Sequence, residues 1–234
     1  MKERGLSFLA EFVPKVLDGS QTVTRRLGGL NEINENPDDW DMPVAGGGPD
    51  EGSWLFPSQG KDSIIIKCPH GVPGDRFYIK ETWQICGWPE GSEPFSVRLR
   101  DGVKVVDCGP DEFPDGEATI ERLWMQCGDD CDKAGLTVNG EGMYIWEDEI
   151  SCPTRWRSGR FQPKWACRPQ RWEIVSVRPE SLQDITEEDS VWEGFYNREC
   201  FSEAWDSINA KRGYPWEKNP WVWRIEWNPE PVEA

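Results

Sequence analysis

The sequence has no long apolar run. No stretch approaches the roughly 20 consecutive apolar residues that cross a membrane, and the apolar part of the first residues, MKERGLSFLAEF, is too short for a signal peptide. We therefore expect a cytoplasmic protein without membrane contact, in a compartment where thiols stay reduced. The eight cysteines are then expected to be free thiols and not a disulfide framework.

Histidine is almost absent, since the chain has only one, His70. It stands in the pattern Cys68-x-His70, and a second pair, Cys127-x-x-x-Cys131, lies in an acidic segment. Thiolate and imidazole suit a tetrahedral zinc site, but neither pair has the Cys-x-x-Cys spacing of a zinc knuckle. We expect no metal and no cofactor, and we keep these four residues as zinc candidates.

Positive charge is also scarce, because 26 Lys and Arg stand against 43 Asp and Glu, which gives a net charge of −17. The acidity is concentrated in residues 27–62 and 84–151, whose net charges are −7 and −11, so the remaining residues sum to +1. A uniformly acidic protein would argue against nucleic-acid binding, whereas this uneven one does not. We interpret both stretches as insertions in a nearly neutral core.

The two insertions differ in pattern. Residues 27–62 are rich in glycine, proline, aspartate and asparagine and have no sustained apolar period. They are expected to form a long loop, clamped by Trp40, Trp54 and Phe56, that the core does not need in order to fold. In the second insertion, residues 94–109 alternate on either side of an Asp-Gly pair and predict a β-hairpin.

Residues 14–26, PKVLDGSQTVTRR, carry the most informative pattern. Apolar residues at helical spacing end at a glycine, and a hydroxyl-rich stretch with two arginines then alternates as a strand does. Arg25 and Arg26 cannot both point into an apolar core, because guanidinium groups keep their charge and are costly to bury unpaired. At least one of them must reach solvent, a carboxylate or a ligand.

Further polar motifs lie between predicted strands and helices. Residues 68–83 contain a Pro-Gly-Asp turn before an alternating strand, and residues 171–195 contain a strand, a turn and a helix capped by Thr186. Residues 201–213 predict a helix that ends at a glycine, and a last strand covers 221–227.

In this order, the segments resemble the ASCH domain family of PUA-like β-barrel proteins, and in particular its phage and prophage branch. The family's Gly-x-Lys-Thr-x-Thr-x-Arg motif corresponds to residues 19–26, and its Cys-Pro-Tyr-Gly turn and strand correspond to residues 68–83. Its Leu-Gln-Asp-Ile motif corresponds to residues 182–194, and the end of the phage sequences, with Asn-Pro-Trp-Val-Trp, corresponds to residues 204–227. These matches cover about half of the chain.

The resemblance implies one α+β domain over residues 1–234, a PUA-like barrel with short flanking helices and two acidic insertions, in a phage protein inside its host cell. ASCH proteins that act as N(4)-acetylcytidine amidohydrolases use a lysine, a threonine and a glutamate, and the matching residues here are Gln21, Thr24 and Glu193. The lysine is missing. A glutamine amide only donates and accepts hydrogen bonds, whereas a desolvated lysine can act as a base or nucleophile.

The chain has fifteen tryptophans, most of which are expected to fill the core of a small barrel. Those beside the motifs, together with nearby bases, are candidates for a nucleobase pocket, in which aromatic walls stack on the base and cations contact phosphates. A solvated basic loop paired with the acidic insertions explains the same bases equally well. The candidates for nucleobase and phosphate binding are Arg25, Arg26, Lys80, Glu81, Trp83, Trp156, Arg157, Lys164 and Trp165.

The polar residues recur in motifs that are far apart in the sequence and share no structural reason to be polar. We therefore expect the motifs to converge on one ligand pocket. The residues expected there are Thr24, Arg26, Lys80, Glu81 and Glu193.

Three functions are compatible with these patterns. The leading one is binding of a nucleobase or nucleoside, modified or not, in RNA or DNA, because binding needs only shape and hydrogen bonds, which Gln21 supplies. The second is an amidohydrolase acting on N(4)-acetylcytidine-like nucleosides, with Glu193 as general base, Thr24 positioning water or the oxyanion, and Lys15 or Lys80 replacing the lysine. The third is an acidic accessory protein whose insertions occupy the nucleic-acid site of a host protein.

Overall fold

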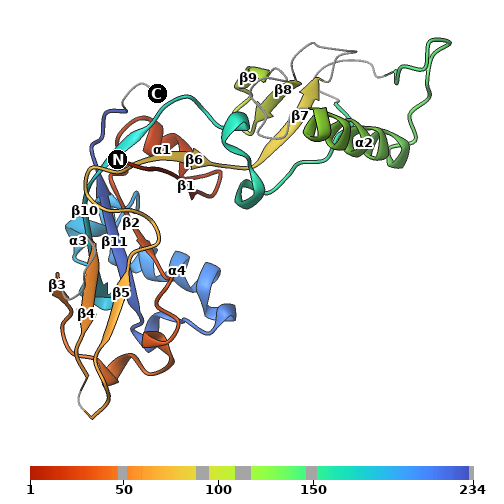
Figure 1. The fold of residues 1–234 in the computed structure, drawn as a ribbon. Helices are drawn as coiled ribbons and strands as arrows, with labels where there is room; N and C mark the ends of the chain where they lie inside the picture. Colours follow the sequence, from red (N-terminus) through yellow and green to blue (C-terminus); the bar gives the residue numbers. More distant parts are fainter. Residues whose placement is uncertain (47–51, 59, 88–94, 109–116, 146–151, 232–234) are drawn as a thin grey trace. The chain divides into compact units, whose positions relative to one another are not determined.

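The chain folds into two compact units (Figure 1). A computed structural model describes residues 1–46, 52–58, 60–87, 95–108, 117–145 and 152–231. Unit 1 consists of Met1–Leu6, Glu11–Tyr78 and Pro169–Ala234, and unit 2 consists of Ser7–Ala10 and Ile79–Arg168.

Unit 1 is built around a five-stranded sheet with the order β1-β6-β10-β11-β2. β10 pairs antiparallel with β6 and β11, and β11 pairs antiparallel with β2, which is an edge strand. The last residues of β1 and β6 belong to unit 2. The strands are β1 (Glu3–Ser7), β2 (Val23–Arg26), β6 (Arg76–Lys80), β10 (Trp172–Ser181) and β11 (Trp221–Trp227).

The two faces of this sheet differ because side chains alternate along each strand. On one face, Trp223, Ile225 and Trp227 of β11 are buried, and Phe77 packs edge-to-face on Trp227 and stacks on Trp172. The other face is covered by helix α4 (Arg198–Asn209). The apolar cluster beneath this helix consists of Leu27, Leu182, Ile185, Phe201, Trp205 and Val222.

The start of α3 and the end of α4 lie where the sequence predicts, whereas α4 (Arg198–Asn209) begins three residues before the expected start at 201. Thr186 caps α3 (Glu187–Trp192), and its hydroxyl accepts a hydrogen bond from the Asp189 N–H at 3.0 Å. Acidic residues fill the first turn of α3, where the helix dipole favours them. α4 continues into a 3-10 turn that stops at Gly213, whose φ of 89° is a left-handed conformation that favours glycine. The first helix, α1, covers Val13–Leu17.

Residues 27–62 contribute more to the core than their composition predicts. Leu30, Ile33, Trp40 and Phe56 are buried, and the Phe56 ring meets the rings of two β11 tryptophans edge-on, with centroids 5.8 and 6.4 Å apart. The expectation of a loop that the core does not need is therefore wrong. Loops and 3-10 turns bury apolar residues without any regular period, so periodicity could not reveal them. The second sheet of unit 1 starts in this segment and consists of β3 (Val44–Ala45), β4 (Ser53–Phe56) and β5 (Ile64–Lys67).

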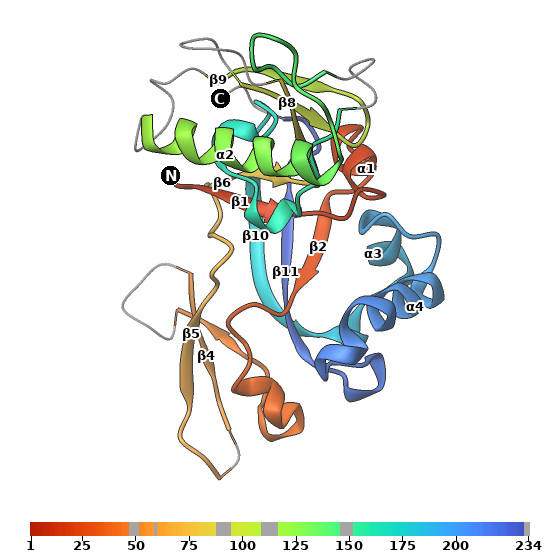
Figure 2. The same ribbon diagram turned by 90° about the vertical axis from the view of Figure 1, so that its right-hand side faces the viewer.

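Unit 2 contains the predicted hairpin within a three-stranded sheet, β7-β8-β9, and a helix packed on it (Figure 2). Its elements are β7 (Trp83–Gly87), β8 (Phe95–Leu99), β9 (Lys104–Cys108) and α2 (Glu117–Lys133). Their shared core consists of Trp83, Ile85, Val97, Leu99, Leu123, Cys127 and Ala166.

The fold class is α+β, as the sequence predicts. Over the described residues, each of the three sheets has the strand order of an open sheet, so closure into a PUA-like barrel stays a prediction. In the described part of the chain, no helix is both long enough and apolar enough to cross a membrane.

Candidate functional site

The candidate residues occur in both units. Because they are divided in this way, their convergence on one pocket stays a prediction. Unit 1 holds Gln21, Thr24, Arg25, Arg26 and Glu193, and unit 2 holds Lys80, Glu81, Trp83, Trp156, Arg157, Lys164 and Trp165.

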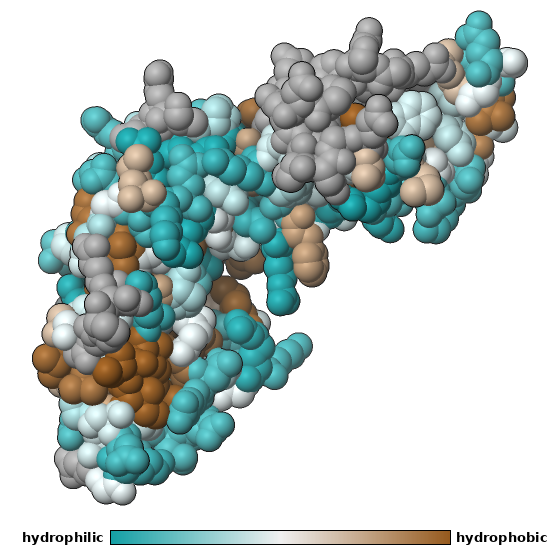
Figure 3. Space-filling model, in the orientation of Figure 1, coloured by the Kyte–Doolittle hydropathy of each residue, from teal (hydrophilic) through white to brown (hydrophobic). Residues whose placement is uncertain are grey.

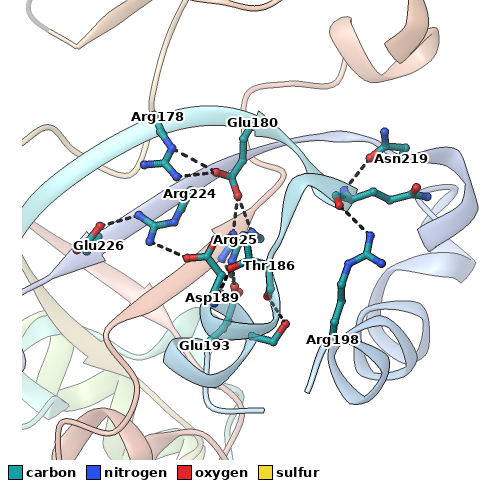
Figure 4. A network of polar contacts seen from close by, with 12 residues as sticks. Arg25, Arg178, Glu180, Thr186, Asp189, Glu193, Arg198, Asn219, Arg224 and Glu226 are labelled. Atoms are coloured by element: carbon teal, nitrogen blue, oxygen red, sulfur yellow. Dashed lines mark hydrogen bonds and ion pairs between the residues drawn. The ribbon is translucent and has the colours of Figure 1, made fainter. Parts of the chain in front are cut away.

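Arg25 lies at the centre of a buried ion network in unit 1 (Figure 4). Its side chain is fully buried. It donates from Nε to Glu180 at 2.7 Å, from Nη2 to Asp189 at 3.0 Å, and from Nη1 to Glu193 at 2.5 Å. Burial alone would lower the pKa of this guanidinium, but the three carboxylates raise it above its usual value. The prediction that at least one of the two arginines reaches solvent, a carboxylate or a ligand is confirmed, because Arg25 contacts carboxylates.

Three arginines stand opposite one another across the sheet. Arg25 on β2 is opposite Arg224 on β11, which is opposite Arg178 on β10. Like charges in this position destabilise a sheet, so acidic side chains must separate them. Asp189 accepts hydrogen bonds from Arg25 and Arg224, each at 3.0 Å, and Glu180 bridges Arg25 and Arg178. Burial would raise the pKa of Asp189, but Arg224 and Arg25 hold it below its ordinary value, so α3 is fastened to the sheet by a charged carboxylate.

Both carboxylate oxygens of Glu193 are engaged by Arg25. Oε1 accepts the backbone N–H of Arg25 at 2.7 Å, and Oε2 accepts its Nη1. Since β2 is an edge strand, Glu193 thereby satisfies a backbone donor that no neighbouring strand reaches. Burial raises the pKa of the Glu193 carboxyl, and Arg25 opposes the rise. A general base must reach a substrate proton, whereas Glu193 is buried and bonded to Arg25, so this geometry favours a structural role.

A catalytic role of Gln21 and Thr24 together with Glu193 stays a prediction. Gln21 is buried, donates from Nε2 to the carbonyl of Val23 at 3.1 Å, and keeps a buried Oε1 that accepts no hydrogen bond from any described residue. Thr24 pairs with Ile225 of β11, so its side chain lies on the opposite face of the sheet from Arg25.

Lys15, a candidate to replace the missing lysine, lies beside Gln21. Its Nζ donates to the carbonyl of Gly194 at 2.5 Å and stands 5.1 and 5.9 Å from the ring centroids of Phe12 and Phe195. A Cβ on Gly194 would lie 2.9 Å from Lys15 Cδ and 3.6 Å from Gln21 Oε1. Lys15, which lies in α1, is therefore bound to the residues that follow α3, through the Gly194 carbonyl and the Phe195 ring.

The zinc candidates lie in different units, with Cys68 and His70 in unit 1 and Cys127 and Cys131 in unit 2. Among the residues that the structure describes, no group of three or more His, Cys, Asp or Glu side chains is placed to hold a metal ion. Burial raises the pKa of the Cys68 thiol to about 11, which disfavours the thiolate that a metal would need.

We expect His70 to make stability pH-dependent. Burial, followed by the charges of Arg26 and Arg4, lowers the pKa of His70 from 6.5 to about 4. Between pH 4 and pH 6.5 the unfolded chain binds a proton at His70 that the folded chain does not. The contribution of neutral His70 to the free energy of unfolding is therefore fully present above pH 6.5 and is lost as the pH falls towards 4. Between pH 7 and pH 5, urea denaturation should show that the wild type loses about 2 kcal/mol more than His70→Asn. Equal losses would mean that His70 titrates normally.

Unit 2 carries a basic loop, residues 154–168, with five Lys or Arg and no Asp or Glu. Its backbone is packed on Glu81, since a Cβ added at Gly159 would lie 2.7 to 2.8 Å from the Glu81 backbone. The side chain of Gln162 is buried, accepts the N–H of Glu81 at 2.7 Å, and donates to the carbonyl of Ala166 at 2.7 Å. The basic loop is therefore anchored at Gly159 and Gln162, although it has little regular structure.

Several predicted site residues serve this anchoring. The buried Glu81 accepts Arg168 Nε at 2.7 Å; burial raises the pKa of Glu81, and Arg168 opposes the rise. Trp83 is buried, with the guanidinium of Arg157 5.5 Å from its ring and the ring of Trp165 edge-on at 5.9 Å. Trp83 is therefore a packing residue, and it is not available to stack on a base.

The basic loop also exposes aromatic and cationic groups. Phe161 is 74% exposed, and Arg160 Cζ lies 5.6 Å from its ring centroid. The half-buried Trp156 has Arg100 Cζ 4.4 Å and Arg98 Cζ 5.7 Å from its ring. Lys80 Nζ donates to the carbonyl of Arg160 at 2.7 Å, and Lys164 is exposed.

Sequence reasoning missed two groups of residues. Glu180, Asp189 and Arg224 were overlooked, although a charged residue inside the apolar strand WVWRIEW is a signal of a buried ion pair. Phe161 was overlooked because one phenylalanine in a loop has no pattern that distinguishes exposure from burial.

Function has to be inferred from this geometry, since comparisons with protein-family models, curated proteins and solved structures found no match.

Proposed function

We propose that the chain binds single-stranded nucleic acid through the basic loop of unit 2, with an unpaired base stacked on Phe161. The observation that carries this proposal is the 74% exposure of Phe161 on a segment whose backbone is fixed at Gly159 and Gln162. Phenylalanine is normally buried, because exposure forgoes about 1.5–3 kcal/mol of transfer free energy. Since the loop is anchored, a bound ligand is a better explanation of this exposure than local unfolding.

The charge around Phe161 favours a polyanion as that ligand. Arg160 lies beside the ring, whereas Arg155, whose side chain is 57% exposed, forms an ion pair with Asp130 at 3.6 Å. Stacking of a base on an aromatic ring contributes about 1–3 kcal/mol, and nearby cations add phosphate contacts whose strength falls with salt. Stacking on an exposed ring requires an unpaired base, which favours a single strand over a duplex.

Binding is preferred to hydrolysis because of the unit 1 geometry. An amidohydrolase of the ASCH type needs its glutamate and lysine, but Glu193 is bonded to Arg25 and the lysine position holds Gln21. We also propose that the chain is a phage protein of the ASCH family with a PUA-like barrel, because its sequence motifs resemble those of that family. The third function, blocking of a host protein by the acidic insertions, rests on segments that lie partly outside the described residues.

The test is fluorescence anisotropy with labelled single-stranded RNA, single-stranded DNA and a duplex, over a salt series. We expect a single strand to bind, and Phe161→Ala to weaken binding by about 5- to 100-fold, which corresponds to the loss of one stacked base. Arg160→Gln should lower the salt slope by about 1. Tyr196→Ala is the matched control, since Tyr196 is an aromatic residue of unit 1 that is 87% exposed.

The proposal would fail if neither single strand bound, or if Phe161→Ala bound as tightly as the wild type. Phe161→Ala and Tyr196→Ala should both unfold at the wild-type midpoint, because each removes an exposed ring. Release of acetate from N(4)-acetylcytidine by the wild type would instead favour the amidohydrolase.

A further inference from the structure

The hairpin formed by β8 and β9, residues 95–108, is basic within an acidic stretch. Residues 84–151 have a net charge of −11, yet the hairpin holds three of their five Lys and Arg and only two of their 16 Asp and Glu, a net charge of +1. The three bases are Arg98, Arg100 and Lys104. On the face shown in Figure 3, teal hydrophilic residues cover much of the described surface of unit 2, whereas a continuous brown patch covers β4 and β5 of unit 1. The hairpin therefore fits an anionic ligand better than an apolar one.

Two of these bases gather at one indole ring. Arg98 lies on the face of the sheet that α2 does not cover, because its neighbours on β8, Val97 and Leu99, both pack in the core shared with α2. Arg100 and Arg98 both approach the ring of Trp156, with Cζ atoms 4.4 and 5.7 Å from its centroid. The basic loop and the hairpin thus meet at Trp156.

The position of Trp156 is fixed by β7. The next residue, Arg157, exchanges two backbone hydrogen bonds with Trp83 of β7, at 2.7 and 3.1 Å. Gln84 is buried, and its Oε1 accepts a hydrogen bond from Arg98 Nη2 at 2.7 Å. The same strand therefore holds both the tryptophan and one of its two arginines.

Arg100 keeps its hydrogen-bond donors open. It is exposed, and it forms no ion pair with any residue that the structure describes. The adjacent Asp101 is engaged elsewhere, since its Oδ2 accepts Arg168 Nη2 at 2.5 Å and its Oδ1 accepts the Val103 N–H at 3.1 Å. A guanidinium stacked on an aromatic face is held flat, and the N–H groups in its plane can bind a phosphate through two hydrogen bonds.

We propose that Arg100 binds a phosphate of the single strand whose base stacks on Phe161, and that Trp156 is the positioning residue for Arg100. This inference rests on the proposed function, because it adds a second contact to the same ligand. All three residues belong to unit 2. Trp156 precedes Phe161 by five residues, so their Cα atoms are at most about 18 Å apart. A strand of about ten nucleotides, at about 3.4 Å for each, is long enough to reach both contacts.

The first test is fluorescence anisotropy with a labelled single strand of about ten nucleotides, over a salt series. Arg100→Gln should weaken binding about 10-fold, as expected for one charged hydrogen-bonded contact. It should also lower the salt slope by about 1. Arg122→Gln is the matched control, because Arg122 is an exposed arginine of α2, on the other side of the sheet, and the change removes the same charge. It should leave the salt slope unchanged.

A double-mutant cycle tests the role of Trp156. Because Trp156 acts through Arg100, Trp156→Ala should weaken binding by the wild type and have no further effect in the Arg100→Gln background. Trp156→Phe should keep most of the affinity, since a phenyl ring also holds a guanidinium. Arg100→Lys should lose affinity although it keeps the charge, because an ammonium has no planar fork. Additive losses in the cycle would show that a base stacks on Trp156 itself and would overturn its positioning role.

The phosphate contact and the proposed function fail in different ways. If Phe161→Ala weakens binding and Arg100→Gln does not, the phosphate contact is overturned and the proposed function stands. If Arg100→Gln weakens binding and Phe161→Ala does not, base stacking on Phe161 is overturned. Absence of binding by the wild type overturns both. Arg100→Gln should unfold at the wild-type midpoint because Arg100 is exposed, and a lowered midpoint would show a structural role instead.

Discussion

Replacement of Arg25 by alanine is expected to destabilise unit 1 by about 3–5 kcal/mol. Arg25 is fully buried and its guanidinium bonds Glu180, Asp189 and Glu193. Removal of this one cation leaves the buried Glu193 without an ion-pair partner, whereas Asp189 keeps Arg224 and Glu180 keeps Arg178. An unpaired buried charge costs far more than the pair contributes. The measurement is urea denaturation at pH 7, where all three carboxylates of the unfolded chain are charged.

Arg178→Ala is the control for Arg25→Ala. Arg178 shares the same row of arginines and contacts Glu180, but its side chain is 48% exposed, so its loss should cost less than about 1 kcal/mol. The deficit of Arg25→Ala should shrink as the pH falls, because Glu193, which has lost its ion-pair partner, can then take up a proton. A loss below about 1 kcal/mol for Arg25→Ala would contradict a buried ion network at this position.

Phe56→Ala is expected to cost about 3–5 kcal/mol, which is the range for truncation of a fully buried phenylalanine. Phe56 is completely buried and its ring meets Trp221 and Trp223 edge-on. The variant removes these ring contacts and leaves a cavity between β4 and β11. Thermal and urea unfolding measure the loss directly.

Val44→Ala is the control for Phe56→Ala, because it shortens an apolar side chain of the same sheet that is 55% exposed. It should cost less than about 1 kcal/mol. If the two variants were equally stable, residues 27–62 would be a peripheral loop as their composition suggests, and the packing of β4 on β11 would be wrong.

The two units divide the polar motifs into different physical roles. In unit 1, Arg25 and Glu193 bond each other and hold α3 on the sheet, so their polarity is explained without a ligand. In unit 2, Phe161 and Arg160 are exposed on a fixed segment, and their exposure is not explained by packing. The proposed binding site therefore follows from the exposed residues and not from the motifs with the most distinctive sequence.

Local structure was predictable from the sequence because short-range physics determines it. The cap of α3 at Thr186, the helix stop at Gly213 and the strand Trp221–Trp227 were all expected and are all observed. Each depends on hydrogen bonds, backbone conformation or side-chain alternation within a few residues. The α+β class was implied by the resemblance to the ASCH family.

Only the tertiary structure decided which charges pair and which side chains are exposed. Arg25 bonds partners 155 to 168 residues away, and no spacing rule connects groups so distant in sequence. Phe56 and Phe161 are both phenylalanines in segments without a period, yet the first is fully buried and the second is 74% exposed. Burial depends on which surfaces the rest of the chain brings together, so a residue's own neighbours in the sequence cannot determine it.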